Sequence, residues 1–296
     1  MLSGAFFFFI VIAVLSYGIQ GSLQTTFARK YDAFVVTLYR NLSLIITMAP
    51  VLLLVPPSQI IAIREHLGTL MLASGLGAIS LLLALSSSKY LPIGVSTALR
   101  QVIQVSVSLM LGIVLLNEWL TFHQFLLLLG IVFSAIALAL SRADFPHLDP
   151  RMVWKGLGLT IVAGLIVAHS FYFFSVLSRA VNPLVAGYFW EVGVGVFALA
   201  YFLILSASGT YKAPAKIPFS DAAKILGIAL LTILGTSCSA LAFNLGPYAL
   251  ASGLTTMTTF VAVIMGWIIY KEHLTKFQIG LIVVAVGLMF LLKVLS

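Results

Sequence analysis

The chain has 296 residues, of which 61% are hydrophobic and only 8% are Asp, Glu, Lys or Arg. A soluble domain carries about 25% charged residues, so this composition excludes a water-soluble globular protein and places the chain in a lipid bilayer. The formal net charge is +8. Because most of the Lys and Arg residues lie between apolar stretches, we attribute this charge to membrane topology rather than to nucleic-acid binding. A single cysteine, Cys238, excludes a disulfide framework and a cysteine-based metal site.

Ten apolar stretches are each long enough to cross a hydrocarbon core of about 30 Å, which takes roughly 20 helical residues. They are too long and too evenly apolar for the strands of a membrane barrel. The first stretch lacks a basic leader and a small-residue cleavage site, so we expect a retained span rather than a signal peptide. The sequence therefore predicts an all-α integral membrane protein with ten transmembrane helices. They cover residues 5–27, 33–55, 67–88, 92–115, 121–141, 154–177, 184–207, 222–243, 248–269 and 275–294.

One sequence signature occurs twice. The pattern Gly-x5-Glu-x-Leu-Thr-x2-Gln begins at Gly112 and again at Gly266, 154 positions later. Each copy ends one apolar stretch and begins the next, so each lies at a tight turn between two helices. We interpret Glu118 and Glu272 of these copies as helix-capping groups near the membrane surface.

The two halves of the chain match elsewhere as well. Arg29-Lys-Tyr-Asp32 corresponds to Arg179-Ala-Val-Asn182, 150 positions later. We therefore divide the chain into a first five-helix repeat (residues 1–142), a linker (143–153) and a second five-helix repeat (154–296). Because five is an odd number, the second repeat must enter the membrane from the opposite side. The prediction is an inverted-topology repeat, in which a binding site lies near the midplane between the halves.

This pattern resembles the drug/metabolite transporter superfamily, specifically its EamA-type members, over nearly the whole chain. The resemblance implies a secondary transporter of small organic solutes that does not hydrolyse ATP, in the cell (inner) membrane of a prokaryote. It implies no particular substrate, because such transporters carry amino acids, sugar derivatives, nucleosides and other metabolites. The chain departs from many of them in one respect. Its fourth and ninth helices lack a mid-helix proline, and polar residues from Arg100 to Gln104 occupy that region of the fourth.

Two arguments about orientation disagree. Outside the helix interiors, eleven Lys and Arg residues lie on the side that carries the turn between the first two helices, and three lie on the other side. The positive-inside rule places the first set in the cytoplasm and both termini outside. The resemblance to EamA-type transporters implies the reverse, so the sequence leaves the orientation open.

Four ionisable residues lie deep inside the predicted helices: Arg40, Arg100, His169 and Glu191. A charge near the bilayer centre costs roughly 2.5–3.5 kcal/mol on insertion scales, so each needs a partner, a water-filled cavity or a function. At a rise of about 1.5 Å per residue, Arg40 and Arg100 lie at a similar depth below one face. Glu191 and His169 lie at a similar depth below the other. We therefore expect a cationic pair opposed by a carboxylate and an imidazole.

Polar residues form a stripe on the fourth helix and another on the ninth. A striped helix in lipid turns its polar face toward protein or water, so we expect both stripes to line a cavity. The alternative is helix–helix packing, in which Ser and Thr are common. We also expect the fourth helix to be about one turn longer, because 22 positions separate Tyr90 from Gly112 but 18 separate Tyr248 from Gly266. The stripes consist of Ser96, Thr97, Arg100, Gln101, Gln104 and Ser108, and of Ser252, Thr255, Thr256 and Thr259.

The predicted site holds an anionic substrate. We expect Arg100, helped by Arg40, to bind a carboxylate with the two parallel hydrogen bonds that a guanidinium provides; Arg40 could instead reach toward the interface. Glu191 is either a proton-coupling group or the counter-ion of an arginine, and His169 is either a proton relay or a packing residue. Further lining candidates are Tyr17, Gln20, Gln24, Tyr172, Trp190 and Asn244.

The expected function is transport of an amino acid or another small carboxylate by alternating access, with protons as a candidate coupling ion and no cofactor or metal. The sequence contains no His-Glu-x2-His metal motif, no Gly-x-Ser-x-Gly elbow and no phosphate-binding glycine-rich loop, so we do not expect an enzyme. The alternative is a non-transporting membrane subunit, or a lipid-processing partner, built on the same scaffold.

Overall fold

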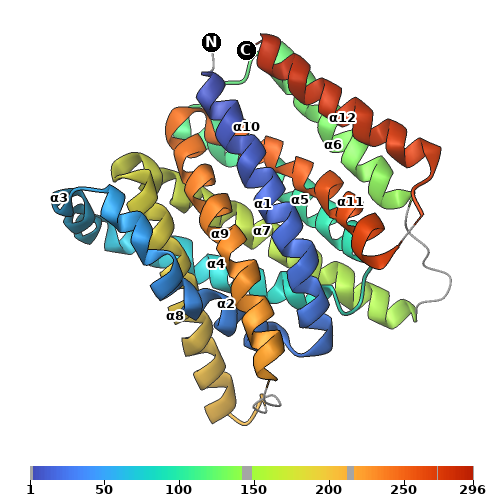
Figure 1. Cartoon of the computed structure of the whole chain (residues 1–296). Helices are drawn as coiled ribbons and strands as arrows, with labels where there is room; N and C mark the ends of the chain where they lie inside the picture. The colour runs from blue at the N-terminus through green and yellow to red at the C-terminus, as the bar shows by residue number, and fades with distance from the viewer. Residues whose placement is uncertain (1–2, 142–148, 212–216, 272, 296) are drawn as a thin grey trace.

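The computed structural model describes residues 3–141, 149–211, 217–271 and 273–295, and within these ranges it is helical without strands (Figure 1). Helical segments occupy all ten expected positions. In the described part of the chain, nine are long and apolar enough to cross a membrane, and α6 adds a shorter apolar helix over Phe122–Leu138. The class of all-α multi-pass membrane protein is therefore confirmed. The helices of the first half are α1 (Gly4–Lys30), α2 (Ala33–Thr47) with η1 (Ala49–Leu54), α3 (Pro57–Ile61) with η2 (Ala62–His66), α4 (Leu67–Ser87), α5 (Ile93–Leu116) and α6 (Phe122–Leu140).

The second half contains α7 (Pro150–Ala180), α8 (Pro183–Ala207), α9 (Phe219–Leu245), a broken ninth span and α12 (Lys276–Leu295). The ninth span consists of α10 (Tyr248–Leu254), the 3₁₀ turn η3 (Thr255–Met257) and α11 (Thr258–Tyr270). Pro92 precedes α5 and Pro247 precedes α10, so these prolines, rather than Tyr90 and Tyr248, are the equivalent positions. The expected extra turn in the fourth helix is therefore wrong: α5 has 24 residues, and the ninth span has 7, 3 and 13.

The repeated signature is a helix stop followed by a helix start. Asn117 and Lys271, one position before each signature glutamate, adopt the left-handed conformation with φ of 54° and 56°, which ends the preceding helix. Four residues later, the Thr121 backbone N–H donates to Gln124 Oε1 at 3.0 Å, and the Gln124 N–H donates to Thr121 Oγ1 at 3.3 Å. This reciprocal arrangement is a capping box. Thr275 and Gln278 repeat it with the same distances.

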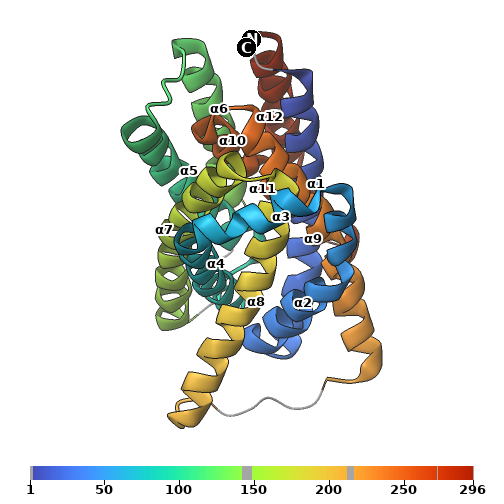
Figure 2. The same ribbon diagram turned by 90° about the vertical axis from the view of Figure 1, so that its left-hand side faces the viewer.

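Helices from the two halves pack against each other throughout the bundle. The main inter-half contacts pair α4 with α7, α1 with α9, α2 with α8, and α5 with α7, α10 and α11. In Figure 2, α8 lies between α4 and α2, and it contacts both. Helices α6 and α12 lie side by side at one edge of the bundle (Figure 1). The two sequence halves thus share one core.

Candidate functional site

A polar cavity lies in the middle of the bundle. Its volume is about 190 Å³. Residues of α1, α2, α4, α5, α7, α8, η3 and α11 line it. Its lining includes Ser88 and Ile93, next to the turn between α4 and α5, and Trp190 and Glu191, in the first half of α8. By the positions of these residues on their helices, the cavity extends from the end of the bundle that holds the α4–α5 turn into the interior. The face at this end carries Lys30 and Lys89.

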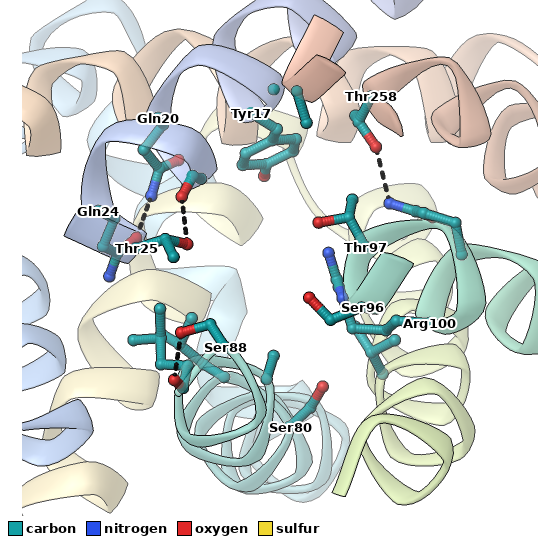
Figure 3. Close-up of a pocket in the computed structure, with 18 of the residues that line it drawn as sticks. Tyr17, Gln20, Gln24, Thr25, Ser80, Ser88, Ser96, Thr97, Arg100 and Thr258 are labelled. Carbon is teal, nitrogen blue, oxygen red and sulfur yellow. Dashed lines mark hydrogen bonds between the residues drawn. The ribbon is translucent and has the colours of Figure 1, made fainter. Parts of the chain in front are cut away.

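Two polar walls face each other across this cavity (Figure 3). Gln20, Gln24 and Thr25 of α1 form one wall. Thr97 and Arg100 of α5 lie on the opposite wall. Gly18 allows α1 to approach α11 closely, because a Cβ there would lie only 2.5 Å from the Val261 Cβ. Gly18 therefore allows the α1 wall to lie next to α11.

Arg100 is the unpaired charge of the cavity. Its side chain is half-buried and borders the cavity. Among the residues that the structure describes, no side chain or backbone group forms a hydrogen bond or ion pair with its guanidinium. A charge in this position is costly in a membrane unless a ligand, water or a function compensates it. The location predicted for Arg100 agrees with the structure.

Arg40 is paired instead with Glu191. Arg40 Nη2 lies 3.2 Å from Glu191 Oε1, and the two residues are only 5% and 1% exposed. Glu191 also accepts from Asn41 Nδ2 at 2.9 Å and from Thr236 Oγ1 at 2.6 Å. Arg40 further donates to Thr232 Oγ1 at 3.1 Å. The structure therefore favours the counter-ion role of Glu191, and it does not join Arg40 to Arg100 as a cationic pair.

The α1 wall is connected to this buried pair. The Tyr17 hydroxyl lies 2.8 Å from Thr236 Oγ1, which is itself bonded to Glu191. Gln20 lies against Arg40, and with its amide oxygen turned toward the guanidinium it accepts from Nε at 2.8 Å. Tyr17, Gln20 and Gln24 all line the cavity, as the sequence suggested. The pair is thus satisfied on several sides before any ligand enters.

The polar stripes of the fourth and ninth spans meet, and they serve both roles that the sequence left open. Toward the far face, Ser252 Oγ donates to Ser108 Oγ at 2.8 Å, and Ser108 lies 2.7 Å from the Tyr248 hydroxyl. Nearer the cavity, Gln101 Nε2 donates to Thr258 Oγ1 at 2.8 Å, and Gln104 Nε2 lies 3.5 Å from Thr255 Oγ1. The stripes therefore bind the two helices together, while the Ser96, Thr97 and Arg100 end of the fourth lines the cavity.

Thr256 and Thr259 do not line the cavity. Both are fully buried, and neither hydroxyl has a hydrogen-bond partner in the described part of the chain. Thr258 takes the lining position instead. The reason is the 3₁₀ turn η3, which has 3.0 residues per turn and shifts the angular phase of the helix that follows. Thr255–Met257 contains neither proline nor glycine, and Gly253 two positions earlier is a weak sign of the break in the sequence.

His169 is exposed on the outer surface of α7, where its Nδ1 lies 2.9 Å from the Leu165 carbonyl oxygen. The residues of α7 that line the cavity are Val167 and Phe171. His169 is two positions from each, and two residues correspond to about 200° around a helix. Its expected place beside Glu191 is therefore wrong.

Three further candidates have separate outcomes. Trp190 lines the cavity, donates from Nε1 to the Ala73 carbonyl oxygen at 3.1 Å, and stacks on Phe174 with ring centroids 4.5 Å apart. Tyr172 is not a lining residue, and its ring contacts that of Tyr248. Asn244 donates to the Ser178 carbonyl oxygen at 3.2 Å, away from the cavity. Sequence reasoning missed the lining residues Thr25, Ser80 and Ser88, because isolated Ser and Thr residues are common in membrane helices.

The side of the bundle beyond the cavity is closed by aromatic side chains. Phe174 packs against Trp190 and Phe243, and Phe243 packs against Tyr248 with ring centroids 5.7 Å apart. The Tyr248 hydroxyl donates to the Ala168 carbonyl oxygen at 2.7 Å. These rings belong to α7, α8, α9 and α10, so one aromatic cluster packs four helices against one another.

An ion pair strengthens the same closed side. Arg179 Nη2 lies 2.6 Å from Glu118 Oε1, and Arg179 also donates to the carbonyl oxygens of Phe243 and Gly246. Glu118 Oε2 accepts from the Ala249 N–H at 3.0 Å, in the first turn of α10. The capping role predicted for Glu118 is confirmed, although the helix it caps belongs to the other half. Glu272, predicted to have the same role, lies outside the described residues.

Comparison with known proteins identifies the fold and no more. No protein-family model matches the sequence, and no curated protein matches it. Twenty-eight chains of known structure match. One of them, from a crystal structure, aligns over 100% of this chain and 98% of its own, with a TM-score of 0.77 and 15% sequence identity. At that identity the likeness establishes the fold, whereas function must be argued from the site.

Proposed function

We propose that this protein is a secondary active transporter that moves a small organic metabolite with a carboxylate group across the membrane by alternating access. The observation that carries this proposal is Arg100, whose guanidinium borders the cavity and has no partner among the described residues. A carboxylate entering the cavity would compensate the charge, and a guanidinium binds it with two parallel hydrogen bonds. An amino acid or another small carboxylate fits this description.

An inverted repeat is supported by the way the helices pair. Exchanging each helix of the first half for its counterpart in the second turns the α4–α7 contact into α9–α1, and the α4–α8 contact into α9–α2. The α2–α8 and α6–α12 contacts are unchanged by this exchange. Such a pattern is expected when two repeats are related by a pseudo-two-fold axis in the membrane plane.

Arg29 and Arg179, which correspond in the two halves, form similar hydrogen bonds. Arg29 Nε donates to the Ser88 carbonyl oxygen at 2.9 Å, and its Nη2 donates to that of Leu91. Arg179 Nε donates to the Phe243 carbonyl oxygen at the same distance. Each arginine thereby ties the end of the first helix of its half to the turn between the third and fourth helices. This likeness supports two repeats that move as comparable units.

A cavity that opens to one face of the bundle and is closed from the other is expected of a single state in an alternating-access cycle. Here the cavity reaches the face that carries Lys30 and Lys89, and the aromatic cluster with the Arg179–Glu118 pair closes the other side. In the proposed cycle the repeats rock about the cavity, and the seal forms alternately on each side. In this cycle Glu191 acts as the counter-ion of Arg40, so the proposal assigns it no proton-coupling role. The resemblance to EamA-type transporters supports a prokaryotic cell membrane as the location.

The test is counterflow in liposomes that contain the purified protein. We expect saturable exchange of a carboxylate substrate, and we expect Arg100→Ala to lower it by at least tenfold. Loss of a hydrogen bond to a charged group costs about 1.5–3 kcal/mol, and 1.4 kcal/mol corresponds to a factor of ten. Arg64→Ala, at an exposed arginine outside the cavity, is the matched control. Undiminished transport by Arg100→Ala would refute the assigned role, and absence of flux for every solute screened would favour the non-transporting subunit.

A further inference from the structure

The cavity has an unequal balance of charge. Among its lining residues, all of which the structure describes, the charged side chains are Arg40, Arg100 and Glu191. Arg40 and Glu191 neutralise each other at 3.2 Å. What remains is one positive charge, that of Arg100. A ligand with a single negative charge would bring the cavity to neutrality, and a charge that is left unbalanced in a bilayer is costly.

Among the described lining residues, the cavity also lacks a free carboxylate that could neutralise an ammonium. Glu191 is the one carboxylate of the lining, within the described residues, and it is 1% exposed. Its oxygens already accept hydrogen bonds from Arg40, Asn41 and Thr236. A substrate ammonium entering this cavity would have to break that arrangement or remain without a counter-ion. Burying an unpaired charge is unfavourable, so the cavity should disfavour zwitterions.

The remaining polar residues of the lining can form hydrogen bonds with hydroxyl or carbonyl groups of a ligand. Gln24 and Gln104 line the cavity, and each keeps one buried side-chain amide atom without a partner in the described part of the chain, which a ligand reaches once the amide turns toward the cavity. A hydroxyl both donates and accepts, so it can satisfy either an amide oxygen or an amide nitrogen. Thr97, whose half-buried side chain shares the Arg100 wall, adds another hydroxyl.

We infer that the substrate is a monovalent organic anion that lacks an ammonium group and carries hydroxyl groups, such as a 2-hydroxy acid or a sugar acid. This inference rests on the proposed transport function and narrows it: zwitterionic amino acids are disfavoured, because no free carboxylate among the described lining residues can neutralise their ammonium group. Arg100 recognises the carboxylate, and the absence of a free lining carboxylate sets the specificity.

The first experiment compares matched solutes in liposomes containing the full chain. Each pair has one carbon skeleton and differs in a hydroxyl or an ammonium: lactate with alanine, glycerate with serine, and phenyllactate with phenylalanine. Gluconate represents the sugar acids, and lactamide is the uncharged control. We expect the exchanged solutes to be the anions, with at least tenfold less exchange of the matching zwitterion.

The outcomes separate this inference from the proposal on which it rests. Exchange of an amino acid at a rate equal to or above that of its hydroxy acid would overturn the inference and leave transport standing, as would exchange confined to neutral solutes. No exchange of any solute would overturn the transport proposal itself.

The second experiment introduces a carboxylate side chain into the cavity by substitution. Thr97 precedes Arg100 by three positions on α5 and lies on the same face of the helix. Thr97→Asp places a carboxylate beside the guanidinium, and it is compared with Thr97→Asn, which has nearly the same size without the charge. We expect Thr97→Asp to exchange the hydroxy acid at least tenfold more slowly than Thr97→Asn and to raise the ratio of amino acid to hydroxy acid exchanged. An equal ratio in the two variants, with both folded by thermal unfolding, would contradict the inference.

Discussion

The two buried arginines should respond to the same substitution with opposite changes in stability. Arg40 and Arg100 both line the cavity, but Arg40 has a carboxylate partner, whereas Arg100 has no partner in the described residues. Replacing either with methionine removes a positive charge and keeps a side chain of comparable length. We expect Arg40→Met to destabilise the empty protein and Arg100→Met to stabilise it.

The magnitudes follow from burial. Arg40→Met leaves the Glu191 carboxylate, which is 1% exposed, without its cation, and breaking a buried ion pair in this way costs about 3–5 kcal/mol. Arg100→Met removes a charge worth about 2.5–3.5 kcal/mol at the bilayer centre. Because the Arg100 side chain is partly exposed and borders the cavity, we expect only part of that, a gain of about 1–2 kcal/mol. At about 2 °C per kcal/mol for a large domain, the melting temperature should fall by about 6–10 °C in the first variant and rise by about 2–4 °C in the second.

Cys238 provides the assay. It is a free cysteine, buried at 7% exposure, so a dye that fluoresces on reaction with a thiol reports unfolding of the detergent-solubilised protein. The double variant Arg40→Met/Glu191→Leu should recover at least half of the loss seen in Arg40→Met, since it no longer buries an unpaired charge. Destabilisation by Arg100→Met comparable to that by Arg40→Met would refute the reasoning, because it would mean that Arg100 also has a partner.

Two further variants test the ends of the bundle. Glu118→Ala removes the partner of Arg179 and the cap at the Ala249 N–H; we expect a loss of about 1–2 kcal/mol, read as a lower melting temperature, and an unchanged value would contradict the capping role. The second variant is Tyr211→Phe. Burial and the hydrogen bond to Asp32 raise the pKa of the Tyr211 phenol above its ordinary value of 10.0. The folded protein thus keeps this phenol neutral where the unfolded chain ionises it, and the parent loses stability as pH rises above about 10. Tyr211→Phe should lose less in melting curves above that pH, and a parallel decline of both proteins would argue against the assignment.

Much of the fold could be predicted because each helix end has a local cause. Pro92 and Pro247 begin spans, and Asp32 and Asn182 cap the helices that follow them, accepting from backbone N–H groups at 2.8 and 3.0 Å. These signals act within a few residues and can be found in the sequence. The 3₁₀ turn at Thr255–Met257 was not predicted, because its local signals, Gly253 and the back-bond from Thr255 to the Ser252 carbonyl oxygen, are common in membrane helices that stay regular.

The depth of the site residues along their helices could be predicted from the sequence, but the direction in which their side chains point could not. A constant rise per residue places Arg40, Arg100 and Glu191 at cavity depth, and all three line the cavity. Which residues meet depends on the rotation of each helix, which is set by packing against neighbours far away in the sequence. For α7, which is apolar on most of its surface, the sequence carries little information about rotation. His169 was accordingly placed on the wrong side.

The proposed cycle gives a reason why one arginine is paired and the other is not. The offset of 150 that relates Arg29 to Arg179 also relates Asn41 to Glu191, and these two equivalent residues contact each other at 2.9 Å. In the proposed inverted repeat, equivalent positions meet at the pseudo-two-fold axis, where a rocking motion would displace atoms least. The Arg40–Glu191 pair can therefore persist throughout the cycle, and a charge that stays buried needs such a permanent partner. Arg100 differs, because a permanent partner would compete with the substrate for the guanidinium. Its charge must be left for the solute to neutralise.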